Sequence, residues 1–76
     1  MISYLNGKLI RKDLEFIVIN VDGVGYKVFT PGSVQANLPQ VGEQVELHTY
    51  TYVREDAIRL YGFSNLEELE LFEKLL

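Results

Sequence analysis

The chain begins with three runs of residues whose composition and spacing are typical of β-strands. These runs cover residues 2–11, 15–21 and 24–30. Asp22-Gly23 separates the second run from the third, and a two-residue Asp-Gly loop suits a type I′ turn, where glycine tolerates a positive φ. The segment Phe16-Ile17-Val18-Ile19 is apolar without alternation, which indicates a strand covered on both faces or one that enters a closed barrel. We therefore predict a hairpin formed by the second and third strands.

Two further strands are predicted after a short helical insert. Residues 33–38 are long enough for a helix of about one turn, which Pro39 ends. Residues 45–53 and 58–63 again have strand character. Five strands with a helix between the third and fourth follow the order of an OB-fold barrel, although composition alone also permits an SH3-like barrel.

From Ser64 the apolar spacing changes to that of a helix. Ser64 and Glu67 stand at the spacing of a capping box, in which hydroxyl and carboxylate satisfy free backbone N–H groups. An apolar stripe at helical spacing follows, made of Leu66, Leu69, Phe72, Leu75 and Leu76. We expect an amphipathic helix that opens a second domain missing from the chain, which divides the sequence into an OB-fold domain (1–63) and this first helix (64–76).

Length and composition restrict the class of protein. A chain of 76 residues has room for one small domain, whose thin core would gain from self-association. There is no cysteine, which excludes disulfides and thiolate metal sites, and a cytoplasmic protein is expected. We also expect neither a signal peptide nor a membrane span, because no run approaches about 18 apolar residues.

The net charge of −4 has the wrong sign for a protein that binds phosphates by itself. Most of the excess lies in the last stretch, where four glutamates face only Lys74. Positions 1–64 hold seven acidic and six basic residues. That part is nearly neutral and is compatible with a local basic patch.

The sequence gives little support for a catalytic site or a metal site. The sequence offers one histidine, His48, as a base, and it alternates with Tyr50 and Tyr52 on one face of the fourth strand. We interpret His48 as a packing or interface residue. Carboxylates on a hairpin tip diverge, and no acidic calcium-loop pattern is present, so neither a metal nor another cofactor is expected.

Four aromatic residues lie on the two strands that flank residues 54–57. They are Tyr50, Tyr52, Tyr61 and Phe63. Such side chains stack on single-stranded bases in some OB-folds. Their spacing fits a barrel core or subunit interface equally well, and positive charge nearby is sparse, so packing is the favoured interpretation.

Glu55 and Asp56 are the main candidate functional residues. They lie where the fourth and fifth strands must reverse, so the chain presents two adjacent carboxylates at a hairpin end. Acidic residues in turns are commonly only solvated. Arg54 beside them forms a local salt bridge in one interpretation, and contacts a phosphate or orients the tip in the other.

Four stretches of the sequence, taken together, resemble one known family. They are Met1-Ile2 with Leu5 and Gly7; Val21-Asp22-Gly23-Val24-Gly25-Tyr26-Lys27-Val28; Leu38-Pro39 with Gly42 and Val45; and Val53-Arg54-Glu55-Asp56-Ala57 with Leu60-Tyr61-Gly62-Phe63. Each is weak alone, but their order and spacing from Met1 resemble the N-terminal domain of the RuvA family of Holliday junction branch-migration subunits. The resemblance favours the OB-fold over the SH3-like barrel.

The resemblance implies a non-catalytic scaffold for DNA recombination and repair. Members of the family form a homotetramer that holds a four-way DNA junction, while a RuvB-type hexameric ATPase drives migration through a third domain. Glu55 and Asp56 then correspond to an acidic pin at the crossover. The family's DNA-binding helix–hairpin–helix motifs are absent before Leu76, and Tyr50 and Tyr52 replace an expected histidine and smaller aliphatic residue. The alternative is an independent OB-fold module that binds single-stranded nucleic acid.

Overall fold

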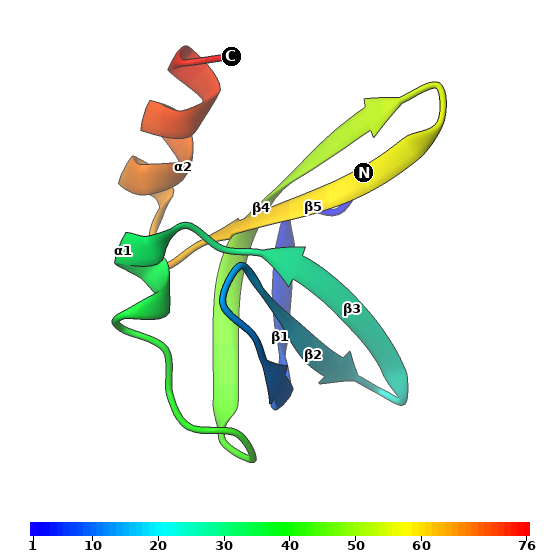
Figure 1. The fold of residues 1–76 in the computed structure, drawn as a ribbon, viewed down its shortest axis with the longest axis vertical. Coiled ribbons are helices and arrows are strands. Elements are labelled where there is room, and N and C mark those ends of the chain that lie inside the picture. Colours follow the sequence, from blue (N-terminus) through cyan, green and yellow to red (C-terminus); the bar gives the residue numbers. More distant parts are fainter.

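The computed structural model describes residues 1–76, which form five strands and two helices (Figure 1). In chain order the elements are β1 (Tyr4–Lys12), β2 (Phe16–Val21), β3 (Val24–Phe29), α1 (Gly32–Gln35), β4 (Gln44–Arg54), β5 (Ala57–Phe63) and α2 (Leu66–Lys74). The predicted order of five strands with a helical insert is confirmed. The insert itself is shorter than predicted, because α1 ends at Gln35 and a turn leads on towards Pro39.

The strands close into a barrel in the order β1-β2-β3-β5-β4. β1 pairs with β4 through its first half and with β2 through its second half, and the register with β2 shifts between Leu9 and Arg11. Such an irregularity bends a strand. The bend allows β1 to pair with two neighbouring strands. The parallel pairing of β3 with β5 closes the barrel. This mainly β architecture is the predicted OB-fold.

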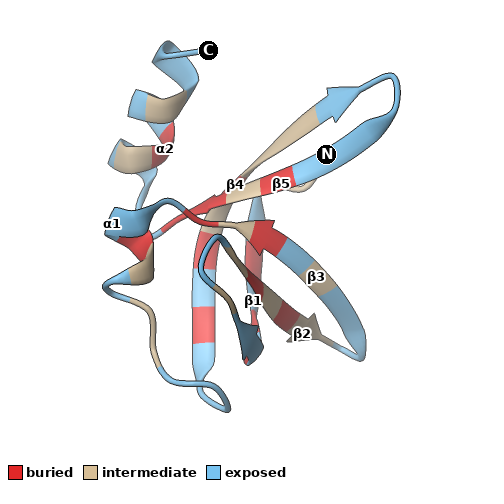
Figure 2. Cartoon of the chain, viewed as in Figure 1, coloured by how far each residue is buried: buried red, intermediate tan, exposed pale blue.

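The core lies inside the barrel, where alternate residues of each strand point inward. Ile17 and Ile19 of β2 are fully buried, whereas Phe16 and Val18 are half-buried on the outer side. The continuous apolar run in β2 therefore belongs to a strand of a closed barrel with a partly covered outer surface. Figure 2 shows the buried positions concentrated on the barrel strands. The other fully buried large side chains are Leu9, Val28, Val34 and Leu47.

Gly62 allows β5 to fit between its two neighbours. A Cβ atom at this position would lie 2.6 Å from Cγ1 of Val28 on β3 and 2.9 Å from Cδ1 of Leu47 on β4. Both distances are shorter than the normal contact between carbon atoms. Closure of the barrel at this point therefore requires glycine.

The turn between β2 and β3 has the predicted geometry. Asp22 and Gly23 both have positive φ angles, 51° and 90°, as a type I′ turn requires. The Gly23 N–H donates to Oδ1 of Asn20 at 2.8 Å. Backbone geometry and a side-chain hydrogen bond together specify this turn.

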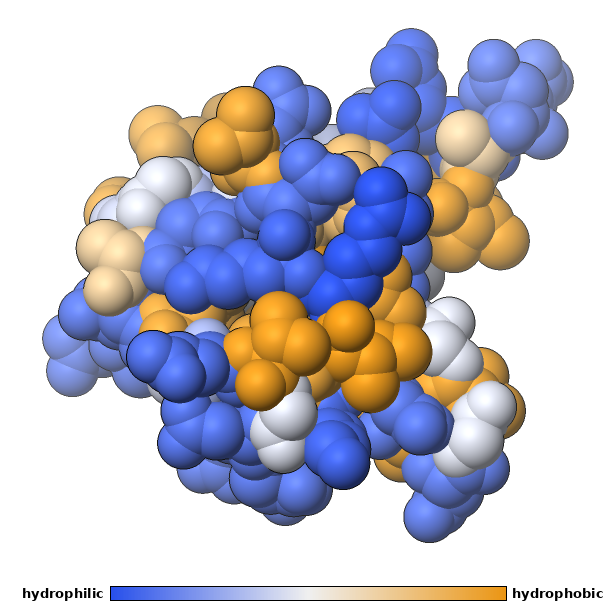
Figure 3. Space-filling view, turned by 60° about the horizontal axis from the view of Figure 1, so that its bottom comes forward, coloured by the Kyte–Doolittle hydropathy of each residue, from blue (hydrophilic) through white to orange (hydrophobic).

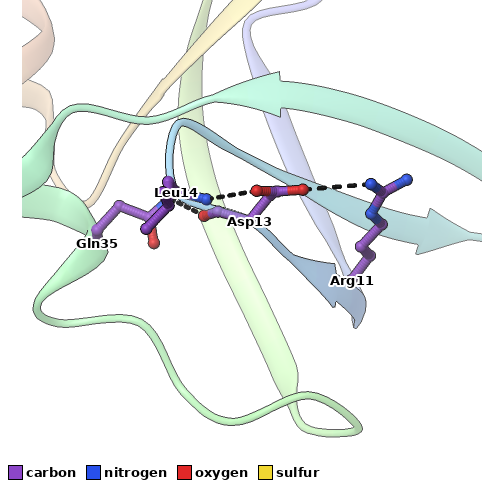
Figure 4. Close-up of polar contacts among 4 residues, drawn as sticks. All are labelled: Arg11, Asp13, Leu14 and Gln35. Carbon is purple, nitrogen blue, oxygen red and sulfur yellow. Dashed lines mark hydrogen bonds and ion pairs between the residues drawn. The ribbon is translucent and has the colours of Figure 1, made fainter.

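The loop between β1 and β2 is attached to α1 (Figure 4). The amide Nε2 of Gln35 donates to the carbonyl oxygen of Asp13 at 3.0 Å. The Asp13 carboxylate accepts from the Leu14 backbone N–H at 2.8 Å and pairs with Arg11 at 3.2 Å. The Leu14 hydrogen bond, followed by the nearby Arg11, lowers the pKa of Asp13.

The predicted C-terminal helix is present, but its predicted cap is wrong. Asn65 caps α2: its Oδ1 accepts from the Glu68 backbone N–H at 2.9 Å, and its Nδ2 donates to the Glu68 carboxylate at 3.1 Å. The capping pair is thus one residue later than Ser64 and Glu67. Asparagine fits because its side-chain amide both accepts and donates hydrogen bonds. Neither helix has the length and apolar character needed to cross a membrane.

The apolar stripe of α2 is only partly buried. Leu69 is buried and Phe72 is half-buried against the barrel, whereas Leu66, Leu75 and Leu76 are exposed. The helix therefore contacts the barrel through the middle of its predicted stripe.

Candidate nucleic-acid interface

β4 and β5 continue beyond the barrel as a two-stranded arm (Figure 1). β1 pairs with β4 only up to His48, and β3 pairs with β5 only at Leu60 and Tyr61. Residues 52–59 consequently pair only with each other. We call this segment the arm, and its outermost two residues, Glu55 and Asp56, the tip.

The tip presents two carboxylates to solvent, as predicted. Arg54 and Ala57 are the last paired residues, so Glu55 and Asp56 form a two-residue turn, and both are exposed. Neither has a positive φ, and neither carboxylate forms an ion pair or accepts a hydrogen bond. In the space-filling view of Figure 3 the side chains at the end of the arm are hydrophilic.

Arg54 does not pair with the tip. The one ion pair in the structure joins Arg11 to Asp13, so the local salt-bridge interpretation of Arg54 is wrong. Its guanidinium carbon instead lies 5.8 Å from the centre of the Tyr52 ring. A cation over an exposed ring gains about 0.5–1 kcal/mol. The guanidinium has no carboxylate partner and is therefore available to a phosphate. Contact between Arg54 and a phosphate stays a prediction.

The aromatic residues beside the tip take part in packing, as favoured from the sequence. The rings of Tyr50, Tyr61 and Phe63 lie 5.8, 5.2 and 5.0 Å from the ring of Phe72 on α2. Tyr52 is nearer to the tip and contacts Tyr61 at 6.4 Å. These aromatic contacts attach α2 to the barrel.

His48 is a packing residue on the outer side of β4. Its ring lies 5.5 Å from the ring of Tyr4, the residue opposite it on β1. The Tyr4 hydroxyl donates to the Glu46 carboxylate at 2.7 Å, and this hydrogen bond raises the pKa of Tyr4. No group of three or more potential metal-ligating side chains comes together.

Sequence reasoning did not single out two cations near the aromatic residues, Lys27 and Arg59. The ammonium of Lys27 lies 4.3 Å from the centre of the Phe16 ring, and the guanidinium carbon of Arg59 lies 4.9 Å from that of Phe29. The two-residue period of a strand could have identified Lys27, because Lys27 is two residues before Phe29 and therefore shares its face. The same period could not identify Arg59, because only closure of the barrel brings Arg59 to this face.

Comparison with known proteins, by family model and by individual relatives, points to one family. Residues 1–62 match the family model described as the RuvA N terminal domain. The chain is 49% identical over 76 residues to the Holliday junction branch migration complex subunit RuvA of Geotalea daltonii, and 51% identical to that of Halothermothrix orenii. Each alignment covers the whole chain and 38% of the relative, so the chain spans well under half the length of these relatives. The chain belongs to the RuvA N-terminal domain family.

Proposed function

We propose that this chain is the N-terminal domain of a non-catalytic scaffold subunit that binds Holliday junctions in recombination and repair. The observation that carries the proposal is the tip, where Glu55 and Asp56 are exposed at the end of an arm without any partner inside the chain. The relatives named as junction branch-migration subunits support the choice of a four-way DNA junction as the ligand.

The chemistry of the tip is repulsion between charges of the same sign. A carboxylate about 4 Å from a phosphate costs about 1 kcal/mol in bulk water and about 4 kcal/mol where the effective dielectric constant is about 20. Carboxylates at a junction crossover keep DNA backbones away from the centre. Separating strands are thereby directed into neighbouring arms of the junction.

Steering of this kind requires several tips around one axis, so the proposal includes a homotetramer. Val53 and Ile58 support self-association, because they form a cross-strand pair on the arm and are 65% and 71% exposed. Sedimentation velocity over a wide concentration range tests this step. We expect the chain to form tetramers, and a strict monomer at high concentration would contradict it.

The remaining components of the proposal lie beyond this chain. α2 is proposed to open a second domain with helix–hairpin–helix motifs, which its exposed leucines and the greater length of the relatives support. A RuvB-type hexameric ATPase is the proposed motor, and it acts through a third domain. In this scheme the N-terminal domain itself carries out no chemical step.

The decisive experiment neutralises the tip in the full-length subunit that carries this domain. Glu55→Gln with Asp56→Asn removes two charges, and we expect tighter junction binding or weaker selectivity over duplex, with an altered migration rate. Glu70→Gln with Glu73→Gln is the control, because it removes two exposed carboxylates of α2. High salt should reduce the differences by screening. Equal behaviour of both variants and the unmodified protein at low salt would refute the role of the tip.

A further inference from the structure

Four aromatic residues stand opposite one another across four strands on the outer surface of the barrel. Phe16 of β2 is in register with Phe29 of β3, Phe29 with Tyr61 of β5, and Tyr61 with Tyr50 of β4. The ring centres of Phe16 and Phe29 are 6.1 Å apart, and those of Phe29 and Tyr61 are 5.9 Å apart. All four side chains are half-buried, so each ring keeps part of its surface accessible. We call these residues the aromatic row.

Three cations form a second row on the same surface. Arg11 is opposite Val18, which is opposite Lys27, and Arg59 of β5 lies over the Phe29 ring, as Lys27 does. We call Arg11, Lys27 and Arg59 the cationic row. Their charges lie over the rings: Arg11 is 5.1 Å from the centre of the Phe16 ring, and Lys27 is 5.3 Å from that of Phe29. A protein with a net charge of −4 thus carries three of its seven cations in one row.

The charges of this surface are only partly neutralised within the chain. Arg11 pairs with Asp13, whereas Lys27, Arg59 and the neighbouring Arg54 form no ion pair. Glu15 lines one hollow beside Arg59, and Asp56 lines the other. Lys27 and Arg59 are thus cations without an ion pair that lie beside aromatic rings.

Two adjoining hollows lie beside Arg59 and Tyr61. One has a volume of about 340 Å³ and is lined by residues that include Phe29, Arg59 and Tyr61. The other, of about 190 Å³, lies nearer to the tip and shares Arg59 and Tyr61 with the first, while Tyr52 and Arg54 line its far side. Their linings include several aromatic rings and the guanidinium groups of Arg54 and Arg59.

We propose that this surface binds a single strand of DNA, with bases on the aromatic row and phosphates on Lys27, Arg54 and Arg59. Proteins that bind single strands combine cations that follow the backbone with rings on which bases stack. A duplex does not fit this chemistry, because its bases are already stacked on each other. The choice of DNA as the nucleic acid rests on the proposed function, but the site does not depend on the tip.

A titration followed by two-dimensional ¹H–¹⁵N NMR tests the site on the 76-residue chain at low salt. We expect an octamer of thymidylate to shift the backbone amides of β3 and β5, including those of Lys27, Phe29 and Arg59. Three phosphate contacts predict that log K falls with log salt at a slope of about −2. An octamer of abasic deoxyribose phosphate should bind at least about fivefold more weakly, because it offers no bases to stack.

Matched substitutions identify the cations involved. Lys27→Gln with Arg59→Gln should weaken binding by at least about tenfold and reduce the salt slope by more than half. Lys8→Gln is the control, since Lys8 is an exposed cation of β1 opposite Asn20 and Gln44, away from both rows. All three side chains are exposed, so the variants should keep the amide dispersion of the folded chain.

Three outcomes would overturn the proposal. The first is that the thymidylate octamer shifts amides elsewhere or none at all. The second is that Lys8→Gln weakens binding as much as the double variant. The third is that dilution without DNA shifts the same amides, which would assign the surface to a second copy of the chain. None of these outcomes bears on the tip, whose test uses a junction and the full-length subunit.

Discussion

The barrel contains two hairpins with two-residue turns, and they differ in what specifies the turn. At Asp22-Gly23 both φ angles are positive and Asn20 accepts a hydrogen bond from the turn backbone. At Glu55-Asp56 neither φ is positive and no side-chain hydrogen bond or ion pair is formed. The first hairpin is part of the barrel wall, whereas the second continues into solvent (Figures 1 and 2).

This difference separates residues that the fold requires from residues that it only presents. Backbone geometry explains the glycine in the first turn, since a side chain there would be strained. No such requirement explains two adjacent carboxylates in the second turn, where many residue types fit the same conformation. The role that we propose for Glu55 and Asp56 therefore lies outside the chain.

The largest expected difference between the hairpins concerns their isoleucines. Ile19 of β2 is fully buried, whereas Ile58 of the arm is 71% exposed. We expect Ile19→Ala to reduce the free energy of unfolding by about 2–5 kcal/mol and Ile58→Ala by about 0.5 kcal/mol or less. Urea denaturation at a concentration where the chain is monomeric measures this difference, because burial of Ile58 in the proposed tetramer would add to its loss. Similar losses in the monomer would mean that the arm packs within the chain.

The turn geometry gives the next largest effect. Gly23 has a φ of 90°, so Gly23→Ala should cost about 1–2 kcal/mol of unfolding free energy. Gly32→Ala is the matched control, because a methyl group there meets nothing within 4 Å and no positive φ is involved. Thermal unfolding should show a clear loss for the first variant only. Equal melting temperatures would show that the turn rearranges without cost.

Neutralising the tip should leave stability almost unchanged. Glu55→Gln with Asp56→Asn alters exposed side chains that make no contact by hydrogen bond or ion pair. We expect a change of no more than about 0.5 kcal/mol in the free energy of unfolding. A larger loss in urea denaturation would show that the carboxylates have a structural role after all, and would weaken the case for a DNA-directed one.

The smallest effect concerns a carboxylate that the fold does use. The folded state lowers the pKa of Asp13, so its contribution to stability is present above its unfolded pKa and is lost as pH falls through the lowered value. Below about pH 4, Asp13→Asn should therefore show a shallower loss of stability than the unmodified chain. Arg11→Gln should keep most of the dependence, because the Leu14 hydrogen bond is the main cause. Denaturation at several pH values measures both slopes.

Much of the candidate site was predictable because it depends on local sequence. The reversal at Glu55 and Asp56 follows from two strand-like runs around a short polar segment, and the structure places both residues at the arm's end. The position of Arg54 next to the tip was also predictable from the sequence. The side chain that it contacts was not. A neighbouring carboxylate is the obvious candidate in sequence, whereas a strand directs adjacent side chains to opposite faces and brings Arg54 beside Tyr52, two residues away.

The sequence by itself determined the features that a few neighbouring residues control. Strand alternation, the type I′ turn at Asp22-Gly23 and the amphipathic character of α2 follow from backbone sterics and side-chain spacing within short segments. Family resemblance added the OB-fold class. Even locally, the sequence pattern favoured the wrong helix cap, Ser64 instead of Asn65, because both residue types suit that position.

Tertiary structure alone decided which residues meet across the barrel. The parallel pairing of β3 with β5 joins residues about 30 positions apart, and it places Arg59 and Tyr61 beside Lys27 and Phe29. Closure also fixes the need for glycine at position 62 and brings Phe72 onto the aromatic residues of β4 and β5. These contacts depend on strand order and on the distance between chain segments in space, which no periodicity within a single segment encodes.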